Sequence, residues 1–305
     1  MYEEIEIFGE KIRIRNYACS SIKNQFNKQK MQLNLYIKIN DGCNAKCEFC
    51  SNRTMQDMGK INLEKLEYVL KYFNERLLLN RISITGGEPM LKIDLLNDVA
   101  NLIYKVIPDA TVTINTNGNN LRKIVNLDAV DKIEGIHISR HHYKDEINKK
   151  IFGTEVASIE DIKYVMNNVK NKKLLRLNCL LMKNNIDNIE EVEKYLEFAS
   201  NLEIFRVGFV SLMKVNDYSR ENFVNFNDIF KCDVINPQTF VHFYDTNICE
   251  CINGAYISKQ GRFTEWYARM TKELNCEYTR QFVYTSDNKL TTGFGKEIII
   301  WPKLK

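Results

Sequence analysis

The sequence lacks the features that mark membrane, secreted and nucleic-acid-binding proteins. No run approaches the 18 or so apolar residues that a membrane-spanning helix requires. The N-terminus, MYEEIEIFGE, begins acidic and alternating, unlike the basic and then apolar segments of a signal peptide. The 43 basic and 39 acidic residues are spread without a long basic block, so nucleic acid as a partner is neither indicated nor excluded. We therefore expect a cytoplasmic protein without a membrane partner.

Composition otherwise fits an ordinary soluble protein. The 305 residues are 44% hydrophobic and include only four prolines, and this length is enough for one large core. The nine cysteines are odd in number, and three of them are crowded into the run DGCNAKCEFCSN. This usage suits metal binding in a reducing compartment better than a disulfide framework.

The crowded cysteines are Cys43, Cys47 and Cys50, and the run GGEP follows at residues 86–89. A C-x-x-x-C-x-x-C loop places three thiolates within reach of one metal centre. An iron-sulfur cube normally takes four cysteine ligands, and structural zinc also takes four protein ligands. One iron of a cube would therefore remain open to bind a substrate or cosubstrate.

Strand-like and helical patterns alternate along the chain. The apolar strand-like runs are continuous, which is typical of a parallel sheet covered by helices. A serine followed by an acidic residue three positions later, at Ser158, indicates a capped helix start. Six strand-helix units predict an α/β fold with a partial (β/α)6 barrel. The predicted strands span 33–39, 81–85, 110–118, 135–139, 174–182 and 203–213, and the predicted helices span 62–78, 91–106, 158–169 and 189–200.

Both ends of the chain predict hairpins. Alternating residues around Phe8 and Gly9 indicate an N-terminal hairpin, and strand-forming segments flank Asp287 and Asn288 before a last strand, EIIIWP. Residues 216–280 show no clean period. We expect an N-terminal hairpin extension at 1–32, the partial barrel at 33–215, and an α+β extension covering the barrel mouth at 216–305.

The unusual motifs all fall at the carboxyl ends of the predicted strands, where ligands gather in parallel strand-helix folds. The cysteine loop follows the first strand, and GGEP follows the second. TNG, SRHHY and Met213 end the third, fourth and sixth, at residues 116–118, 139–143 and 213. Chance motif matches would not share one rim.

The cysteine spacing, with aromatic Phe49 before the third cysteine, resembles the signature of the radical SAM superfamily. The resemblance implies a [4Fe-4S] cluster whose open iron chelates S-adenosylmethionine. One electron from the cluster then cleaves a carbon-sulfur bond, and the 5'-deoxyadenosyl radical abstracts hydrogen from a substrate. A flavodoxin or ferredoxin-type reductant is the implied partner.

The resemblance also implies roles for residues at the rim. Gly86, Gly87 and Glu88 would contact the methionyl amino group, Ser139 the ribose or methionine, and Asn117 the cofactor. Phe49 and Met213 would flank the adenine. Arg176 and Asn178 project from one face of the fifth strand, and a buried arginine requires a partner. That partner is either a carboxylate or phosphate of S-adenosylmethionine or substrate, or an internal ion pair. These cofactor-binding candidates are Phe49, Gly86, Gly87, Glu88, Asn117, Ser139, Arg176, Asn178 and Met213.

Each assignment has a plainer alternative. The cysteine loop could hold zinc with a distant ligand such as Cys249, and GGEP or TNG could be ordinary turns. Met213 is a candidate core residue. His141, His142 and Tyr143 either bind substrate, relay a proton or belong to a solvated loop.

The remaining cysteines bear on the subtype. The segments RLN and FVSLMKV resemble the cyclases that begin molybdenum-cofactor synthesis, but their C-terminal C-x-x-C is absent and Tyr36 replaces an expected basic residue. We therefore do not transfer their nucleotide substrate. The C-terminal cysteines either form an auxiliary cluster, donate a hydrogen atom or are small buried hydrophobes. They are Cys232, Cys249, Cys251 and Cys276.

The sequence thus predicts a radical SAM enzyme that acts on a small metabolite such as a sugar, nucleoside or amino acid. A peptide-modifying enzyme is the alternative, because the N-terminal hairpin offers an edge strand to an extended peptide. A third possibility, from another class, is a non-catalytic iron-sulfur or metal-binding sensor.

Overall fold

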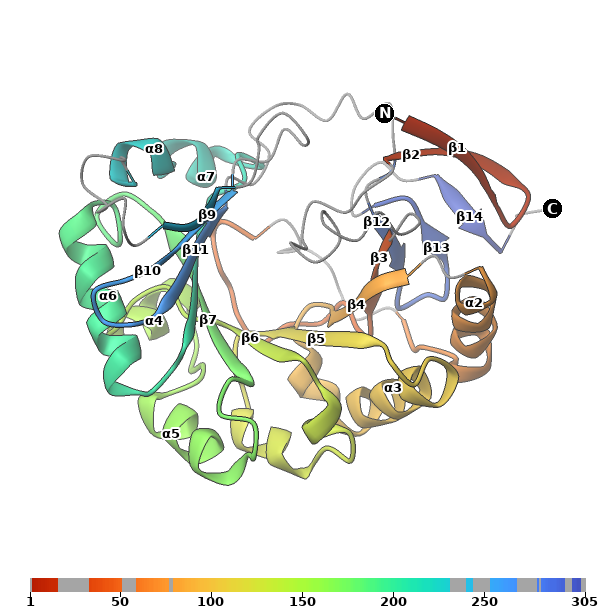
Figure 1. The fold of residues 1–305 in the computed structure, drawn as a ribbon, viewed down its shortest axis with the longest axis horizontal. Coiled ribbons are helices and arrows are strands. Elements are labelled where there is room, and N and C mark those ends of the chain that lie inside the picture. Colours follow the sequence, from red (N-terminus) through yellow and green to blue (C-terminus); the bar gives the residue numbers. More distant parts are fainter. Residues whose placement is uncertain are drawn as a thin grey trace.

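The centre of the protein is a curved, open parallel sheet (Figure 1). The computed structural model describes residues 2–15, 33–50, 59–76, 79–230, 240–243, 253–267, 279, 281–293 and 298–302. Within this part of the chain, six parallel strands lie side by side in sequence order, so the predicted partial barrel is confirmed. These strands are β3 (Leu33–Lys38), β4 (Leu79–Thr85), β5 (Thr111–Thr116), β6 (Gly135–Ser139), β7 (Leu175–Leu181) and β8 (Arg206–Ser211).

Strands from the C-terminal part of the chain extend the sheet at both ends. β12 (Gln281–Tyr284) pairs in parallel with β3, and β11 (Phe263–Tyr267) pairs in parallel with β8. Antiparallel strands continue outward as β13 (Leu290–Thr291) and β14 (Ile299–Trp301) on one side, and β10 (Asn253–Ile257) and β9 (Phe240–Phe243) on the other. The irregular sequence of 216–280 gave no sign of β9, β10 or β11. The three-part domain division stays a prediction.

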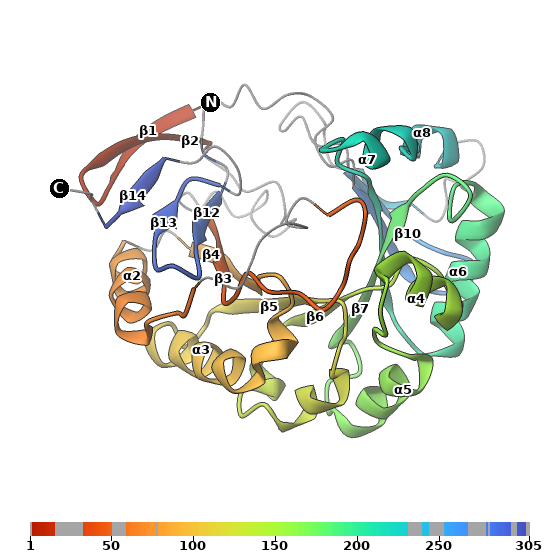
Figure 2. The ribbon, with the colours of Figure 1, turned by 180° about the vertical axis from the view of Figure 1, so that it is seen from behind.

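Helices cover the outer face of the sheet (Figures 1 and 2). The N-cap side chains of Asn62 and Ser158 accept hydrogen bonds from the first turns of α2 and α5, and Ser158 forms the predicted capping box with Asp161. α4 was not predicted, because its eight residues are too few to show a helical period. The main helices are α2 (Leu63–Glu75), α3 (Ile93–Val106), α4 (Asp145–Phe152), α5 (Ile159–Asn168) and α6 (Ile189–Asn201).

Shorter helical segments complete the connections between strands. They include η1 (Pro89–Lys92), η2 (Leu121–Asn126), η3 (Val130–Lys132), α7 (Asp217–Glu221) and α8 (Phe226–Ile229). No helix among the described residues is long and apolar enough to cross a membrane.

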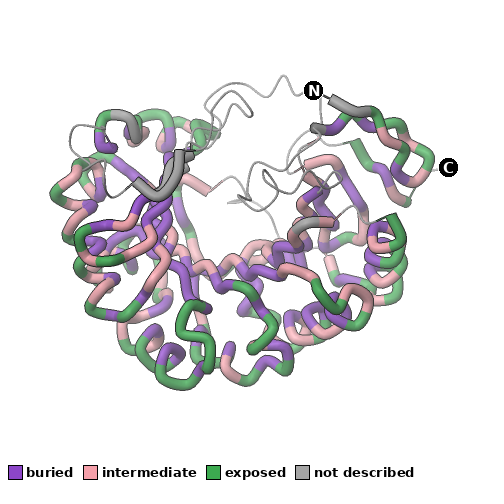
Figure 3. Tube along the Cα trace, viewed as in Figure 1, coloured by how far each residue is buried: buried purple, intermediate pink, exposed green. Residues whose placement is uncertain are grey.

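The core lies between the sheet and these helices (Figure 3). Leu35 and Ile37 alternate along β3 with Tyr36 and Lys38, and both aliphatic side chains are fully buried in the core cluster. Each contributes about 1.5–3 kcal/mol by its burial. Because side chains alternate across a strand, Tyr36 and Lys38 belong to the opposite, inner face of the barrel. The inner face is therefore the polar one.

Hairpins occupy both ends of the chain, as predicted. β1 (Tyr2–Ile7) and β2 (Glu10–Arg15) are antiparallel, and both turn residues have positive φ, 51° at Phe8 and 80° at Gly9. This conformation is strained for Phe8, whose ring stacks on Tyr72 with centroids 3.8 Å apart. Between β12 and β13, Asn288 takes φ 65° at the second turn.

Candidate active site

The cysteine loop follows the carboxyl end of β3. The Cys43 side chain is exposed, Cys50 is half-buried and Cys47 is buried. Burial raises the pKa of the Cys43 thiol, the nearby charges of Glu88 and Cys50 raise it further, and the Ala45 N–H, 3.4 Å from the Cys43 Sγ, opposes them. A bound metal would reverse this balance, because metals ligate and stabilise the thiolate.

The GGE segment after β4 lies directly against this loop. The Gly87 N–H donates to the Asn40 carbonyl and the Glu88 N–H donates to the Gly42 carbonyl, both at 2.9 Å. A Cβ at Gly87 would lie 2.1 Å from the Gly42 carbonyl oxygen. Only glycine allows the two backbones to approach this closely.

Asn40 joins the two segments through its side chain. Its Nδ2 donates to the Gly42 carbonyl at 3.1 Å and to the Glu88 carbonyl at 3.0 Å, and the residue is 1% exposed. Sequence reasoning missed Asn40. A buried polar residue at the end of the strand before the loop was the available signal.

Glu88 connects this pair of segments to the end of β5. Its Oε1 accepts from the Met90 N–H at 2.9 Å and the Thr116 hydroxyl at 2.5 Å, and its Oε2 accepts from the Asn117 N–H at 2.6 Å. Burial raises the pKa of Glu88 to about 7, although these three hydrogen bonds favour the charged form. The carboxylate is thus held by groups of the protein itself.

Asn117 links the end of β5 back to the cysteine loop. Its Nδ2 donates to the Asn44 Oδ1 at 2.9 Å and lies 3.9 Å from the Cys43 Sγ. The ends of β3, β4 and β5 are therefore linked in a ring of hydrogen bonds, which brings together the cysteine loop, GGE and TNG as the sequence predicted. Throughout, we call this arrangement the three-strand ring: Asn40, Gly42–Asn44, Gly87, Glu88, Thr116 and Asn117.

His141 lies beside the cysteine loop but is buried, with 4% of its surface exposed. Its ring contacts Phe49 edge-on at 5.3 Å and stacks on Phe152 at 4.9 Å. The Leu180 N–H donates to its Nδ1 at 3.2 Å, so the proton of the neutral ring sits on Nε2. His141 therefore packs against Phe49 as a buried residue and is not part of an exposed rim.

His142 and Tyr143 also form hydrogen bonds within the protein. The His142 Nδ1 accepts from the Lys144 N–H at 3.0 Å, and burial lowers the pKa of this histidine. The hydroxyl of half-buried Tyr143 donates to the Glu191 carboxylate at 3.0 Å. Their substrate role stays a prediction.

The inner face at β6, β7 and β8 carries the other predicted contacts. Ser139 lies opposite Asn178 in the sheet, and the Arg176 Nε donates to the Asn178 Oδ1 at 3.0 Å. Met213, two residues beyond β8, is 37% exposed and therefore not a core residue. Arg176 has an internal partner, because its NH1 lies 2.8 Å from a Glu265 oxygen on β11.

Further basic residues surround Arg176, and sequence reasoning missed them. His137 lies opposite Arg176 in register, and Arg176 lies opposite Arg206. Burial, and then the charges of Arg176, Arg206 and Arg81, hold the pKa of His137 well below its usual range, so this histidine is neutral. Their signal in the sequence was a basic residue within each of three strands, Arg81 in β4, His137 in β6 and Arg206 in β8.

The C-terminal cysteines Cys232, Cys249, Cys251 and Cys276 lie outside the described residues. Within the described part, no three histidine, cysteine or acidic side chains are gathered around one point as a single metal ion requires. An iron-sulfur cube does not require three ligands around one point, because each cysteine binds a separate iron.

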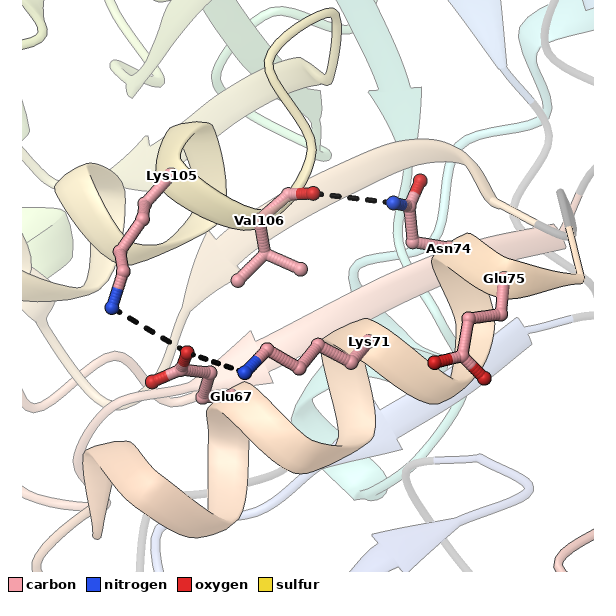
Figure 4. A pocket seen from close by; sticks show the side chains of 6 residues that line it. All are labelled: Glu67, Lys71, Asn74, Glu75, Lys105 and Val106. Atoms are coloured by element: carbon pink, nitrogen blue, oxygen red, sulfur yellow. Dashed lines mark hydrogen bonds and ion pairs between the residues drawn. The ribbon is translucent and has the colours of Figure 1, made fainter.

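A pocket of about 390 Å³ lies away from this site, in the seam between α2 and α3 (Figure 4). Three of its charged groups pair with one another: Glu67 with Lys71 at 2.9 Å and with Lys105 at 3.4 Å. The remaining lining residues are Asn74, Glu75 and Val106. These residues hold two helices together and bring no reactive group to the pocket.

Comparison with known families agrees with this geometry. The pattern of the radical SAM superfamily matches residues 37–199, from β3 through most of α6. The chain belongs to the radical SAM superfamily. It is accordingly an enzyme, with a [4Fe-4S] cluster and S-adenosylmethionine as cofactors.

Several relatives of this radical SAM enzyme are known. It is 29% identical over 171 residues to a probable GTP 3',8-cyclase of Thermococcus kodakarensis, covering 55% of this chain and 53% of the relative. It is 25% identical over 202 residues to the GTP 3',8-cyclase of Aquifex aeolicus, covering 64% and 62%. The chain thus spans a little over half the length of these curated relatives.

Solved structures share the fold. Streptococcus suis SuiB bound to S-adenosylmethionine superimposes with a TM-score of 0.61 at 17% identity, over 91% of this chain and 65% of that one. Histidine-tagged anSMEcpe with bound AdoMet gives 0.55 at 18% identity, over 86% and 74%. The donor set of this chain fits the cluster, because three thiols lie on one loop whose backbone is pressed against GGE at Gly87.

Proposed function

We propose that this radical SAM enzyme abstracts hydrogen from a small metabolite that carries an anionic group. Cys43, Cys47 and Cys50 would ligate three irons of the cluster and leave the fourth for S-adenosylmethionine. The observation that carries the proposal is the three-strand ring, which fixes the cysteine loop against GGE and TNG. When bound, the cluster and S-adenosylmethionine supply the 5'-deoxyadenosyl radical.

The residues of the chain would orient the cofactor. The side chain of Glu88 is occupied by Met90, Thr116 and Asn117, and its carbonyl accepts from the Asn40 Nδ2. The backbone carbonyls of Gly86 and Gly87 are therefore the acceptors that we propose for the methionyl ammonium. Phe49, held by His141, and exposed Met213 would contact the adenine. Ser139 and Asn178 face the same inner surface.

The inner face of the barrel supports an anionic substrate. Arg176 is the neighbour of buried His137 in register, Arg206 is the neighbour of Arg176, and the charges of both, with that of Arg81, lower the pKa of His137. Arginine forks recognise carboxylate and phosphate groups. The curated relatives are named for GTP, which is itself an anion. The identity of the substrate does not transfer from them, since Tyr36 stands where a basic residue is expected.

A peptide substrate is the second candidate. The outer edge of β1 pairs with no other strand among the described residues, so an extended peptide could add to it. Either substrate class requires an electron donor, for which a flavodoxin or ferredoxin-type protein is proposed.

The deciding experiment measures iron, sulfide and the electron paramagnetic resonance spectrum of anaerobically reconstituted protein. We expect four irons, a spectrum shifted by S-adenosylmethionine, and 5'-deoxyadenosine release under dithionite. A Cys43, Cys47 and Cys50 triple alanine variant should lose all three, while Cys179→Ala, which removes a buried cysteine of β7, should keep them. Zinc in place of iron would refute the proposal. Faster release with anionic metabolites than with peptides would favour the first substrate class.

A further inference from the structure

Asn148 lies in the middle of α4 and is fully buried, although asparagine is a poor helix former. Its Oδ1 accepts from the N–H groups of His141 and His142, at 2.7 and 3.1 Å. Its Nδ2 donates to the carbonyls of His142 and Lys144, at 2.5 and 2.8 Å. All four hydrogen-bonding positions of the amide are thus used by the loop that follows β6.

The other end of α4 lies against the cysteine loop. The Phe152 carbonyl accepts from the Lys46 N–H at 2.7 Å, and Lys46 stands between Cys43 and Cys47 in the sequence. Gly153, the C-cap of α4, has φ 66°, and a Cβ there would lie 3.3 Å from the Lys46 Cβ. The helix thus joins the loop after β6 to the loop that carries the three cysteines.

The His141 ring connects the same two loops by packing. It stacks on Phe152 at 4.9 Å and contacts Phe49 edge-on at 5.3 Å. Asn148 accepts from the His141 N–H, and the Asn185 Nδ2 donates to the His141 carbonyl at 2.7 Å. Side chains therefore fix both backbone groups of His141, and the ring, whose Nδ1 also accepts a hydrogen bond, is held between the two phenylalanines.

We propose that Asn148 is a positioning residue for S-adenosylmethionine, which acts through His141 on Phe49. This inference rests on the contact between Phe49 and the adenine proposed above. Without the amide, His141 loses its anchor on α4, and its ring no longer holds Phe49 in one orientation. A favourable aromatic contact then weakens, which corresponds to about three- to tenfold in affinity.

The test is a double-mutant cycle on cluster-loaded protein, in which S-adenosylmethionine shifts the electron paramagnetic resonance spectrum. Asn148→Asp replaces the Nδ2 donor by an oxygen that faces the carbonyls of His142 and Lys144. This variant should retain four irons and need about three- to tenfold more S-adenosylmethionine for half of the shift. In protein that already carries His141→Ala, the same substitution should change this concentration by less than about twofold.

Asn74→Asp is the matched control, because it makes the same change on a helix away from the cysteine loop. Asn74 of α2 is half-buried, and its Nδ2 donates to the Val106 carbonyl at 3.2 Å (Figure 4). This control should melt at a lower temperature and bind S-adenosylmethionine as the wild type does.

If Asn148→Asp does not fold, Phe152→Leu takes its place in the cycle. Leucine removes the ring that stacks on His141 but keeps the backbone carbonyl that accepts from the Lys46 N–H. It should cause the same loss of affinity, and the loss should again disappear in His141→Ala protein.

Three outcomes would overturn the inference: unchanged binding in the variant of the cycle, a loss that adds in full to that of His141→Ala, or an equal loss in Asn74→Asp. Binding is measured without substrate, so missing release of 5'-deoxyadenosine would refute the proposed reaction and leave the role of Asn148 standing. A wild-type spectrum that S-adenosylmethionine does not shift would overturn both.

Discussion

Replacing Asn40 by aspartate tests the three-strand ring with an almost isosteric change. The Nδ2 group donates to two backbone carbonyls, of Gly42 and Glu88, at 3.1 and 3.0 Å. In Asn40→Asp this donor becomes an oxygen that faces both carbonyls at a site only 1% exposed. Two side-chain hydrogen bonds contribute about 1–3 kcal/mol together, and burial of an unpaired carboxylate adds to the loss. We expect a total destabilisation of about 2–4 kcal/mol.

The assay is thermal unfolding of the anaerobic, cluster-loaded protein, together with the spectral shift produced by S-adenosylmethionine. The melting temperature should fall by roughly 5–10 °C, and half-saturation of the spectral shift should need more S-adenosylmethionine. Burial raises the pKa of the new aspartate above about 4, its value in the unfolded chain. The variant should therefore come closest to wild type in acid, and the deficit should grow as pH rises.

Asn34→Asp is the matched control, because it makes the same change within β3, the strand that leads to Asn40. Asn34 is half-buried and lies opposite Arg81 in the sheet, so the new carboxylate has a cation on the neighbouring strand. We expect Asn34→Asp to melt within about 2 °C of wild type. An Asn40→Asp protein with unchanged melting temperature and unchanged response to S-adenosylmethionine would refute the role of Asn40.

Three other predictions concern the same site. Because burial raises the pKa of Glu88 from 4.5 to about 7, the free energy of unfolding of the wild-type protein should fall by about 3 kcal/mol as pH rises between these values. Glu88→Gln should abolish this pH dependence of the melting temperature. An identical dependence in the variant would contradict the assignment. Gly87→Ala places a Cβ 2.1 Å from the Gly42 carbonyl and should lose iron on desalting, whereas Gly293→Ala, with no described atom within 4 Å, should retain it. His141→Ala removes the ring behind Phe49 and should weaken S-adenosylmethionine binding in a spectral titration more than His142→Ala does; equal effects would count against that support.

Much of the framework could be predicted because it depends on local patterns. The six strands of the barrel show continuous apolar runs, and parallel strands collect their following motifs on one rim. That rule placed Cys43, Gly87 and Asn117 together before any contact was known, and the structure links them by hydrogen bonds. Their roles towards the cofactor stay predictions.

The remainder depends on partners that are distant in the sequence. Arg176 pairs with Glu265 across 89 positions, and Glu265 lies in a segment without a clean period. For His141 the sequence left substrate contact, a proton relay and a solvated loop open, and it did not predict the burial, because that comes from Phe49 and Phe152, which belong to other elements. Asn40 carries no motif, since an asparagine at a strand end is common in turns.

The junction between β3 and β12 has a consequence for how the protein is made. Val283 of β12 pairs with Tyr36 of β3, the Ser286 hydroxyl contacts the Asp41 carboxylate, and the Asn288 Oδ1 accepts from the Asn62 N–H at 2.6 Å. Both flanks of the cysteine loop are thus fastened by residues that are translated more than 220 positions after their partners. Contacts so far apart in the chain form late in folding. We therefore expect stable cluster insertion only after β12 and the turn that follows it have been translated, and not into a shorter nascent chain.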